Sequence, residues 1–505
     1  MTKKIIVIGA GVAGLASAIR LQHAGYQVEL FEKEALPGGK MHRIEKDGFT
    51  FDLGPTIVMM PELYREVFEL CGRDPDDYIP MHKLEPMFQV YFKDEMDHPY
   101  KGSSDLTEMM KTLESINPDD AQGFLNYLQE IYKRFHIAKD YFIQRPFRHF
   151  KDFYNPFMLK QALKLKTFDS ADQFIGKYIK DERIKNMLSF QTLYIGISPY
   201  NGPSLYSIIP MIEFLYGVWF IKGGMYTMAS AMERLFYELG GKIHYNASVE
   251  KISIVSGRAD GIYVNGRKEE ADYVVCNADF PYAMKHLVQD KQAKGKYTDA
   301  KIDAMKYSCS CFLLYLGTNR KYEEVEGVHN FVFKSDLKKN IDDIFTGERL
   351  RNGAFYVHIP TKVDPSMAPE GNEGMYVLLP VSELSIAKYE WNDETIQYYR
   401  DYLIGEMEKI KGFENIEQEI ISESYITPVD FKERFNAYHG ATFGLQPTLL
   451  QSNHMRPQSK ATHCENLYFT GSSTHPGAGV PIVLLSAKIA AQELLLDDKG
   501  TVFNY

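Results

Sequence analysis

The sequence predicts a mixed α/β fold in which a Rossmann-like dinucleotide-binding domain is assembled from separate parts of the chain. Three observations lead to this prediction: a glycine-rich turn between a strand and a helix near the N-terminus, a second group of strands that begins near residue 223, and a Gly/Pro-rich turn before a final apolar helix. At 505 residues the chain has room for two or three domains.

The expected domain organisation is discontinuous. Residues 1–75, 223–300 and 426–505 are predicted to form the dinucleotide-binding domain. Residues 76–222 are rich in aromatic side chains and interrupted by prolines, which predicts a helical insert. Residues 301–425 alternate strand-like and helical stretches, so we expect them to contribute β-sheet and helices to a substrate-binding domain.

Composition and charge exclude several classes of function. The chain has 67 Asp+Glu against 57 Lys+Arg, a formal net charge of −10, which argues against a general nucleic-acid-binding surface. The five cysteines lack metal-ligand spacing and the 14 histidines form no HExxH motif, so we expect no metal site and a reducing, cytoplasmic compartment. No apolar stretch reaches the roughly 18 to 20 residues of a membrane-spanning helix.

The first β-α-β unit carries a dinucleotide-binding motif at residues 3–33. Gly9 permits the tight turn after the strand, Gly11 lets the backbone approach a pyrophosphate, and Gly14 lets the helix pack closely on the strand. Glu32 follows Gly14 by 18 residues, near the usual spacing for the acid that accepts the ribose hydroxyls. The free N–H groups at the start of the helix favour a bound pyrophosphate.

Two further loops favour FAD over NAD. The sequence PGGK at 37–40 follows Glu32 closely, as in flavoproteins whose chain passes near the cofactor at this point. Two interpretations of Lys40 stay open, namely a cation that faces the phosphates or the flavin, and a solvated surface lysine. In GFTFDLGPT, at 48–56, bare backbone after a short strand is expected to contact the isoalloxazine ring.

The C-terminal segment NLYFTGSSTHPGAGVPIV completes the predicted cofactor site. The N-terminus of the last helix is expected to stabilise the negative charge of the reduced flavin. His475 has two open interpretations, a catalytic role or a role in fixing the loop backbone. No second GxGxxG follows a strand, so FAD is the predicted cofactor. The residues predicted to bind it are Gly9, Gly11, Ala13, Gly14, Glu32, Gly38, Gly39, Lys40, Gly54, Pro55, Thr56, Val249, Gly471, Gly477, Gly479, Val480 and Pro481.

These segments, together with GVWFIKGGMY at 217–226 and FNAYHGATFGLQPTLLQS at 435–452, make the chain resemble the bacterial phytoene desaturase family of carotenoid flavoproteins. The resemblance extends from residue 4 to about residue 493. It implies a fold like that of glutathione reductase and the amine oxidases. PTIVMMP at 55–61 and QTLYIGISPYNGPSLYSIIPMIE at 191–213 are most similar to the dehydrosqualene (4,4′-diapophytoene) desaturases of that family.

The resemblance implies an FAD-dependent desaturase that converts C30 dehydrosqualene stepwise to 4,4′-diaponeurosporene. The expected chemistry is hydride transfer from an allylic CH₂ to flavin N5, with proton loss from the neighbouring carbon. Quinone or O₂ is the expected electron acceptor. Three alternatives stay open: a C40 phytoene desaturase, a flavin oxidase of amines or carotenoid end groups, and a non-catalytic isoprenoid carrier on the same fold.

Few side chains qualify as catalytic groups. Asp152 matches an acid proposed as catalytic in some C40 members of the family, but Asn155 stands where those members have an arginine. Tyr438 and His439, in NAYHG, are the other candidates, and the alternative is that they only stabilise a turn. Ser472 follows the strand glycine, where related flavoproteins often carry an acid that holds the ribityl chain.

A polyisoprenoid hydrocarbon dissolves only in a bilayer, so the enzyme must reach a membrane. Residues 132–166 mix nine lysines and arginines with nine phenylalanines and tyrosines, and only Asp140 and Asp152 oppose those charges. This composition is typical of a surface that docks on anionic lipid. The helical insert is therefore expected to face the membrane and to hold the protein on the inner face of the cell membrane. The alternative is an ordinary solvated helical face.

Overall fold

A five-stranded parallel sheet organises the dinucleotide-binding part of the protein, in the strand order β19-β13-β1-β2-β9. The computed structural model describes residues 2–93, 95–165, 167–334 and 336–501. Strand β1 occupies the centre because its four residues after Lys4 are apolar and buried. The strands come from three distant parts of the chain: β1 (Lys4–Ile8), β2 (Gln27–Phe31), β9 (Lys242–His244), β13 (Tyr273–Cys276) and β19 (Leu467–Phe469).

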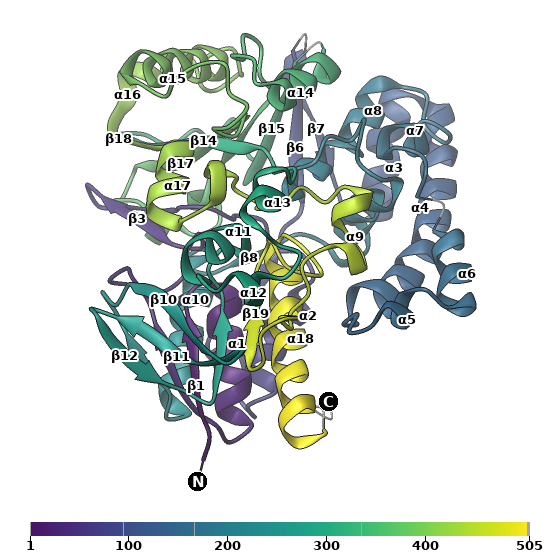
Figure 1. The fold of residues 1–505 in the computed structure, drawn as a ribbon. Coiled ribbons are helices and arrows are strands. Elements are labelled where there is room, and N and C mark those ends of the chain that lie inside the picture. Colours follow the sequence, from purple (N-terminus) through teal and green to yellow (C-terminus); the bar gives the residue numbers. More distant parts are fainter. Residues whose placement is uncertain (1, 94, 166, 335, 502–505) are drawn as a thin grey trace.

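Both faces of this sheet are covered. Ile5 and Val7 of β1 join the core under α1 (Val12–His23), α10 (Tyr226–Glu238) and α18 (Val480–Lys499). Ile6 and Ile8 point the other way, toward an antiparallel meander of β10 (Val249–Val255), β11 (Arg258–Val264) and β12 (Arg267–Glu270). Figure 1 shows these layers in the lower part of the molecule. The β11–β12 turn lies at Asn265 and Gly266, both with positive φ, the conformation that an Asn-Gly pair favours in a two-residue hairpin turn.

A seven-stranded sheet forms the second half of the protein, in the order β18-β14-β17-β16-β15-β6-β7. All neighbours are antiparallel except β15 and β6. Two strands come from the segment 76–222, which was expected to be helical, because an apolar run at 88–92 pairs with β15 far along the chain. The strands are β6 (Phe88–Phe92), β7 (Glu95–Gly102), β14 (Ser310–Thr318), β15 (His329–Phe333), β16 (Phe355–His358), β17 (Glu373–Val381) and β18 (Ile420–Ile426).

Helices stand on both sides of this second sheet (Figure 1). On one side lie α14 (Leu337–Thr346), α15 (Asp393–Met407) and α16 (Ile416–Glu419). On the other lies a group of helices from the middle of the chain: α3 (Leu106–Ile116), α4 (Pro118–Ala138), α5 (Phe150–Phe153), α6 (Pro156–Lys164), α7 (Ala171–Ile175), α8 (Glu182–Met187) and α9 (Ile208–Tyr216). Among the described residues, no helix has the length and apolar character needed to cross a membrane.

Short elements connect the two sheets. Two small antiparallel ladders are formed by β3 with β4 and by β5 with β8. The connecting elements are α2 (Pro61–Glu69), α11 (Phe280–Tyr282), α12 (Lys291–Lys294), α13 (Asp299–Asp303), α17 (Pro428–Phe435), β3 (Arg43–Lys46), β4 (Phe49–Asp52), β5 (Met81–Lys83) and β8 (Trp219–Ile221). The fold class predicted from the sequence is confirmed, whereas the exact domain boundaries stay a prediction.

Candidate functional site

The turn from β1 into α1 has the close packing that its glycines predict. A Cβ atom on Gly14 would lie 1.9 Å from the carbonyl oxygen of Gly9, and one on Gly11 would lie 2.8 Å from Nδ2 of Asn277. Gly9 has a φ of 91°, a conformation that side chains disfavour. Helix α1 begins at Val12 without a side-chain cap. Its first N–H groups are therefore available to an anionic ligand.

Glu32 lies at the end of β2 and is held toward this turn. Its carboxylate accepts a hydrogen bond from the N–H of Ala10 at 2.6 Å and another from the N–H of Glu34 at 2.9 Å. Burial raises the pKa of this carboxyl group, while the two backbone donors oppose the change. The carboxylate is thus fixed beside the glycine turn, where the ribose of a dinucleotide is expected.

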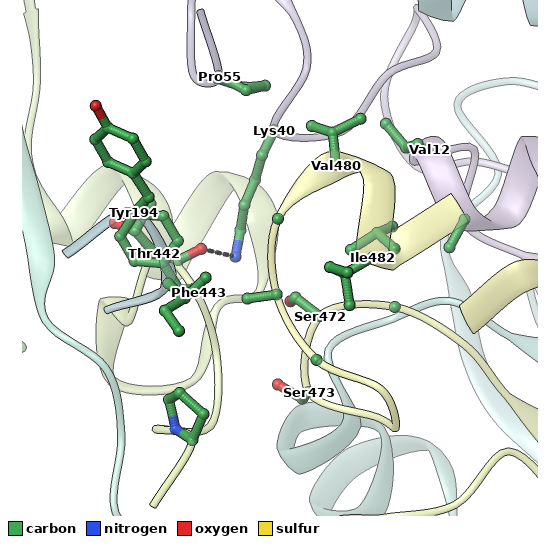
Figure 2. A pocket seen from close by; sticks show the side chains of 18 of the residues that line it. Val12, Lys40, Pro55, Tyr194, Thr442, Phe443, Ser472, Ser473, Val480 and Ile482 are labelled. Carbon is green, nitrogen blue, oxygen red and sulfur yellow. Dashed lines mark hydrogen bonds between the residues drawn. The ribbon is translucent and has the colours of Figure 1, made fainter. Parts of the chain in front are cut away.

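The PGGK loop runs against the same turn. The N–H of Gly38 donates to the carbonyl of Ala10 at 2.9 Å, and a Cβ on Gly39 would lie 3.3 Å from Cα of Gly11. Lys40 points its Nζ across the cavity to the carbonyl of Thr442, at 2.7 Å (Figure 2). Burial lowers the pKa of this ammonium group. Lys40 therefore lies in the cavity wall, and the surface interpretation does not fit its contacts.

The C-terminal loop is clamped by a buried arginine that sequence reasoning missed. The guanidinium of Arg456 donates to the carbonyls of Leu445, Ser472 and Thr474 at 2.6 to 3.1 Å. Burial lowers the pKa of Arg456 to about 10. Only the long return of the chain after β18 brings this side chain under the loop, so no local motif identifies it.

His475 has a structural place in the same loop. Its Nε2 is 2.9 Å from the carbonyl oxygen of Arg145, and burial lowers its pKa to about 4. The imidazole does not line the cavity. Of the two interpretations of His475, the contacts support the one in which it fixes the loop backbone. Helix α18 follows at Val480, again without a side-chain cap.

One continuous cavity of about 690 Å³ joins the dinucleotide-binding loops to an apolar chamber. All predicted cofactor-binding residues except Gly14 line it, and Gly14 instead packs α1 on β1. In Figure 2, Pro55 lies above Lys40, while Val480, Ile482 and, farther away, Val12 lie on one side of it. The apolar lining farther on includes Phe135, Phe142, Phe153, Phe190, Leu193, Tyr194, Leu205, Ile208, Ile209, Ile212, Phe331, Phe333, Tyr356, Tyr376 and Leu378.

The residues present fit FAD. Two helices begin without side-chain caps at the cavity, a buried carboxylate stands at the ribose position, and glycines allow close backbone approach. Thr442 also lines the cavity, and its hydroxyl oxygen is buried without a hydrogen bond of ordinary geometry among the described residues. Among those residues, no cluster of side chains could hold a metal ion.

The predicted catalytic side chains lie outside this cavity lining. Asp152 accepts a hydrogen bond from the N–H of His149 at 2.8 Å, which is a local turn contact. The hydroxyl of Tyr438 donates a hydrogen bond to the Asp303 carboxylate and accepts one from Nζ of Lys285 at 2.8 Å. His439, next to it, has a φ of 56° in a tight turn. A catalytic role for these residues stays a prediction, and their contacts do not support it.

The glycine turn, the buried acid and the C-terminal helix define a flavin-binding oxidoreductase. A family model described as "Flavin containing amine oxidoreductase" matches residues 12–495, and the chain belongs to this family. It is 47% identical to a Staphylococcus haemolyticus protein named 4,4′-diapophytoene desaturase (4,4′-diaponeurosporene-forming), over 98% of this chain and 99% of that protein. A protein of the same name from Staphylococcus aureus strain Newman is 46% identical over the same shares of the two chains.

Solved structures show the same fold at low sequence identity. An oxidoreductase from Methanosarcina mazei has a TM-score of 0.64 and 19% identity, covering 96% of this chain and 98% of that one. Putrescine oxidase bound to putrescine has a TM-score of 0.61 and 13% identity, covering 98% and 99%. At these identities the likeness concerns the fold alone. The predicted family, fold class and FAD cofactor are confirmed by the comparisons together.

Proposed function

We propose that this protein is an FAD-dependent desaturase that converts the C30 hydrocarbon 4,4′-diapophytoene stepwise to 4,4′-diaponeurosporene in carotenoid biosynthesis. The observation that carries the proposal is the continuity of the cavity, with glycine loops and a buried acid at one end and aromatic and aliphatic walls farther on. Relatives that share 46–47% identity with nearly the whole chain are named for this reaction.

The apolar walls suit a substrate that has no polar group. Rings of Phe190 and Phe331 lie 4.4 Å apart, and Phe331 lies 4.9 Å from Tyr356, so a hydrocarbon chain meets a nearly continuous aromatic surface. Burial of apolar surface stabilises binding by about 25 cal/mol per Å². The same walls exclude water and hold an allylic carbon in a fixed place. A bound flavin supplies the acceptor for the hydride of that carbon.

Expression in hosts that make either 4,4′-diapophytoene or phytoene tests this proposal. We expect a yellow pigment with the absorption spectrum of 4,4′-diaponeurosporene in the C30 host, and less conversion in the C40 host. Each host carrying the empty vector is one control, and the host that makes the other precursor, phytoene, is the second. Pigment from phytoene alone would assign the C40 substrate instead, and no pigment from either precursor would refute a desaturase function.

We also propose that the mouth of the cavity rests on the membrane. The lining reaches Phe153 and Ala162 on α5 and α6 and Leu449 and His454 on the C-terminal part of the chain. The two segments touch, since the rings of Phe153 and His454 stack at 3.8 Å. Large apolar side chains are exposed around this mouth, at Tyr154, Phe157, Leu159, Leu163, Phe168, Leu449, Leu450 and Met455.

The fully exposed charges on α5 and α6 are basic, which favours anionic lipid. Lys151, Lys160 and Lys164 are exposed on the helices that carry the apolar residues. Two other basic residues of the segment are structural: Arg134 is buried and donates to the carbonyl of Leu165, and Arg148 pairs with Glu493 and Asp497. Lys166 lies outside the described residues. This surface supports peripheral attachment to the inner, cytoplasmic face of the cell membrane.

Sedimentation with lipid vesicles tests the membrane proposal. Wild-type protein should bind phosphatidylglycerol vesicles more strongly than phosphatidylcholine vesicles, and added salt should weaken the binding. The double variant Phe157→Ser/Leu163→Ser should lose at least ten-fold in binding. Ile421→Ser is the matched control, because it also removes an exposed aliphatic side chain, far along the chain on β18. Equal binding by wild type and the double variant would rule out this surface.

The membrane also holds a suitable oxidant. We propose that quinone or O₂ takes the electrons from the reduced protein, because no second nucleotide-binding motif is present to receive NAD(P). The rate of product formation by membranes without oxygen, with and without added quinone, tests the choice. Activity that needs O₂ even when quinone is supplied would exclude quinone.

A further inference from the structure

A short chain of hydrogen bonds leads from the cavity wall into the second sheet. The hydroxyl of Tyr356 lies 2.8 Å from Oγ1 of Thr56 and 2.6 Å from Nδ1 of His329. Tyr356 and Thr56 line the cavity, and His329 stands behind them, 1% exposed. The register of β15 and β16 pairs Phe331 with Tyr356, so the tyrosine and His329 share one face of the sheet.

The protonation states of this chain follow from its burial. Burial keeps the pKa of Tyr356 well above its ordinary value, so the phenol retains its proton. Burial and the neighbouring His358 ring hold the pKa of His329 well below its ordinary value, so the imidazole is neutral. A neutral imidazole has one bare nitrogen that can accept a hydrogen bond. In the arrangement that follows, the hydroxyl of Tyr356 donates to Nδ1 of His329 at 2.6 Å, and the hydroxyl of Thr56 donates to the hydroxyl of Tyr356 at 2.8 Å.

This chain begins at the boundary between the two halves of the cavity. Thr56 follows Gly54 and Pro55, which line the cavity beside Lys40. On its other side, Tyr356 lies against Phe331, one of the aromatic residues of the apolar chamber. A hydroxyl group backed by an imidazole thus lies between the predicted flavin loops and the apolar chamber.

We propose that Tyr356 is the catalytic group that accepts the proton of the substrate and passes its own proton to Nδ1 of His329. The inference rests on the proposed desaturase function. One allylic C–H bond breaks with its electron pair leaving as hydride to the oxidised flavin. The C–H bond on the neighbouring carbon breaks, its electron pair becomes the new π bond, and its proton goes to Oη of Tyr356. The phenol proton moves to Nδ1 of His329. Both hydrogens and both electron pairs are then accounted for, since one pair leaves with the hydride and the other forms the π bond.

Other polar groups of the cavity are less suited to this step. Glu32 is engaged by two backbone N–H groups at the glycine turn, and Lys40 is a donor. Tyr376 also presents a phenol to the cavity, but it donates at 3.0 Å to the carbonyl of Gly54, which cannot take up a proton. Tyr315 provides the matched control, because its phenol is buried outside the cavity lining and donates at 2.6 Å to the carbonyl of Leu53, so Tyr315→Phe also loses one hydroxyl group.

The first test compares Tyr356→Phe with Tyr315→Phe. Both should keep wild-type flavin absorbance. In anaerobic single turnovers with 4,4′-diapophytoene, flavin reduction by Tyr356→Phe should slow by 10²-fold or more, whereas Tyr315→Phe should stay within about three-fold of wild type. Deuterium at the carbon that loses the proton should give a larger isotope effect in Tyr356→Phe. Equal rates in wild type and Tyr356→Phe, or equal losses in the two variants, would overturn the assignment.

The second test addresses His329 and does not depend on the substrate. In protein labelled with ¹⁵N-histidine, the NMR signals of the His329 imidazole are identified as those that disappear in His329→Asn. In the wild-type protein these signals should show that Nδ1 carries no proton and that Nε2 is protonated. A proton on Nδ1 would overturn the proposal even if the protein is a desaturase. Asparagine keeps an acceptor for Tyr356 but is not a base, so full activity of His329→Asn would also overturn it. Failure of wild type to convert the substrate counts only against the proposed function.

Discussion

Glu213 is a carboxyl group buried in the apolar wall of the protein, and its ionisation should weaken the fold. It lies on α9 next to Ile212, which lines the cavity, and is 0% exposed. Nε2 of Gln191 donates to its Oε2 at 3.1 Å, while its Oε1 has no hydrogen-bond partner among the described residues. Burial raises the pKa of Glu213 from 4.5 to about 8. The folded protein therefore favours the protonated carboxyl group.

The sign and size of the effect follow from the two pKa values. Below about pH 4.5 the group is protonated in both folded and unfolded chains and has no effect on the pH dependence. As pH rises from 4.5 to 8 the unfolded chain releases this proton first, so the free energy of unfolding falls. A difference of about 3.5 pKa units, at about 1.36 kcal/mol each, gives about 5 kcal/mol of lost stability above pH 8. Glu213→Gln keeps the shape and cannot ionise.

Chemical unfolding between pH 5 and pH 9 measures this difference. The advantage of Glu213→Gln over wild type should grow steadily with pH and level off above pH 8. Glu394→Gln, on the exposed first turn of α15, removes a carboxylate that is 82% exposed and should follow the wild-type curve. Parallel curves for Glu213→Gln and wild type would show that this carboxyl group titrates alike in folded and unfolded chains.

Three further outcomes test the cavity. Gly14→Ala should lose most of its bound flavin, because the new Cβ would lie 1.9 Å from the carbonyl oxygen of Gly9. Gly405→Ala is the control and should keep its flavin, because a Cβ there has nothing within 4 Å. Equal flavin content in the two variants would contradict this packing argument. Glu32→Gln should raise the Kd for FAD at least ten-fold in titrations of the apoprotein, since hydrogen bonds to a charged group contribute about 1.5–3 kcal/mol. An unchanged Kd would show that the Glu32 carboxylate does not bind the cofactor. Ala354→Phe should lower turnover ten-fold or more at unchanged flavin content, because residue 354 lines the cavity; full turnover would place the substrate elsewhere.

The amino-acid sequence alone determined the features that depend on neighbours in the chain. The turn of Gly9, Gly11 and Gly14, the acid at the end of β2, and the hairpin at Asn265 and Gly266 each need only a few consecutive residues in a given backbone conformation. Such local conditions leave a pattern of glycine and apolar spacing. FAD, the fold class and the family followed from those patterns.

Only the tertiary structure decided which distant residues share the cavity. Strand β6 joins β15 although the surrounding segment is largely helical. Arg456 meets the C-terminal loop through the carbonyl groups of Ser472 and Thr474. Tyr438 and His439, for which the sequence left a catalytic and a turn-stabilising role open, are not among the residues that line the cavity. Hydrogen bonds such as the one between Tyr356 and His329 join side chains on different strands. No local spacing encodes such a contact, because strand register and the packing of the two sheets bring its members together.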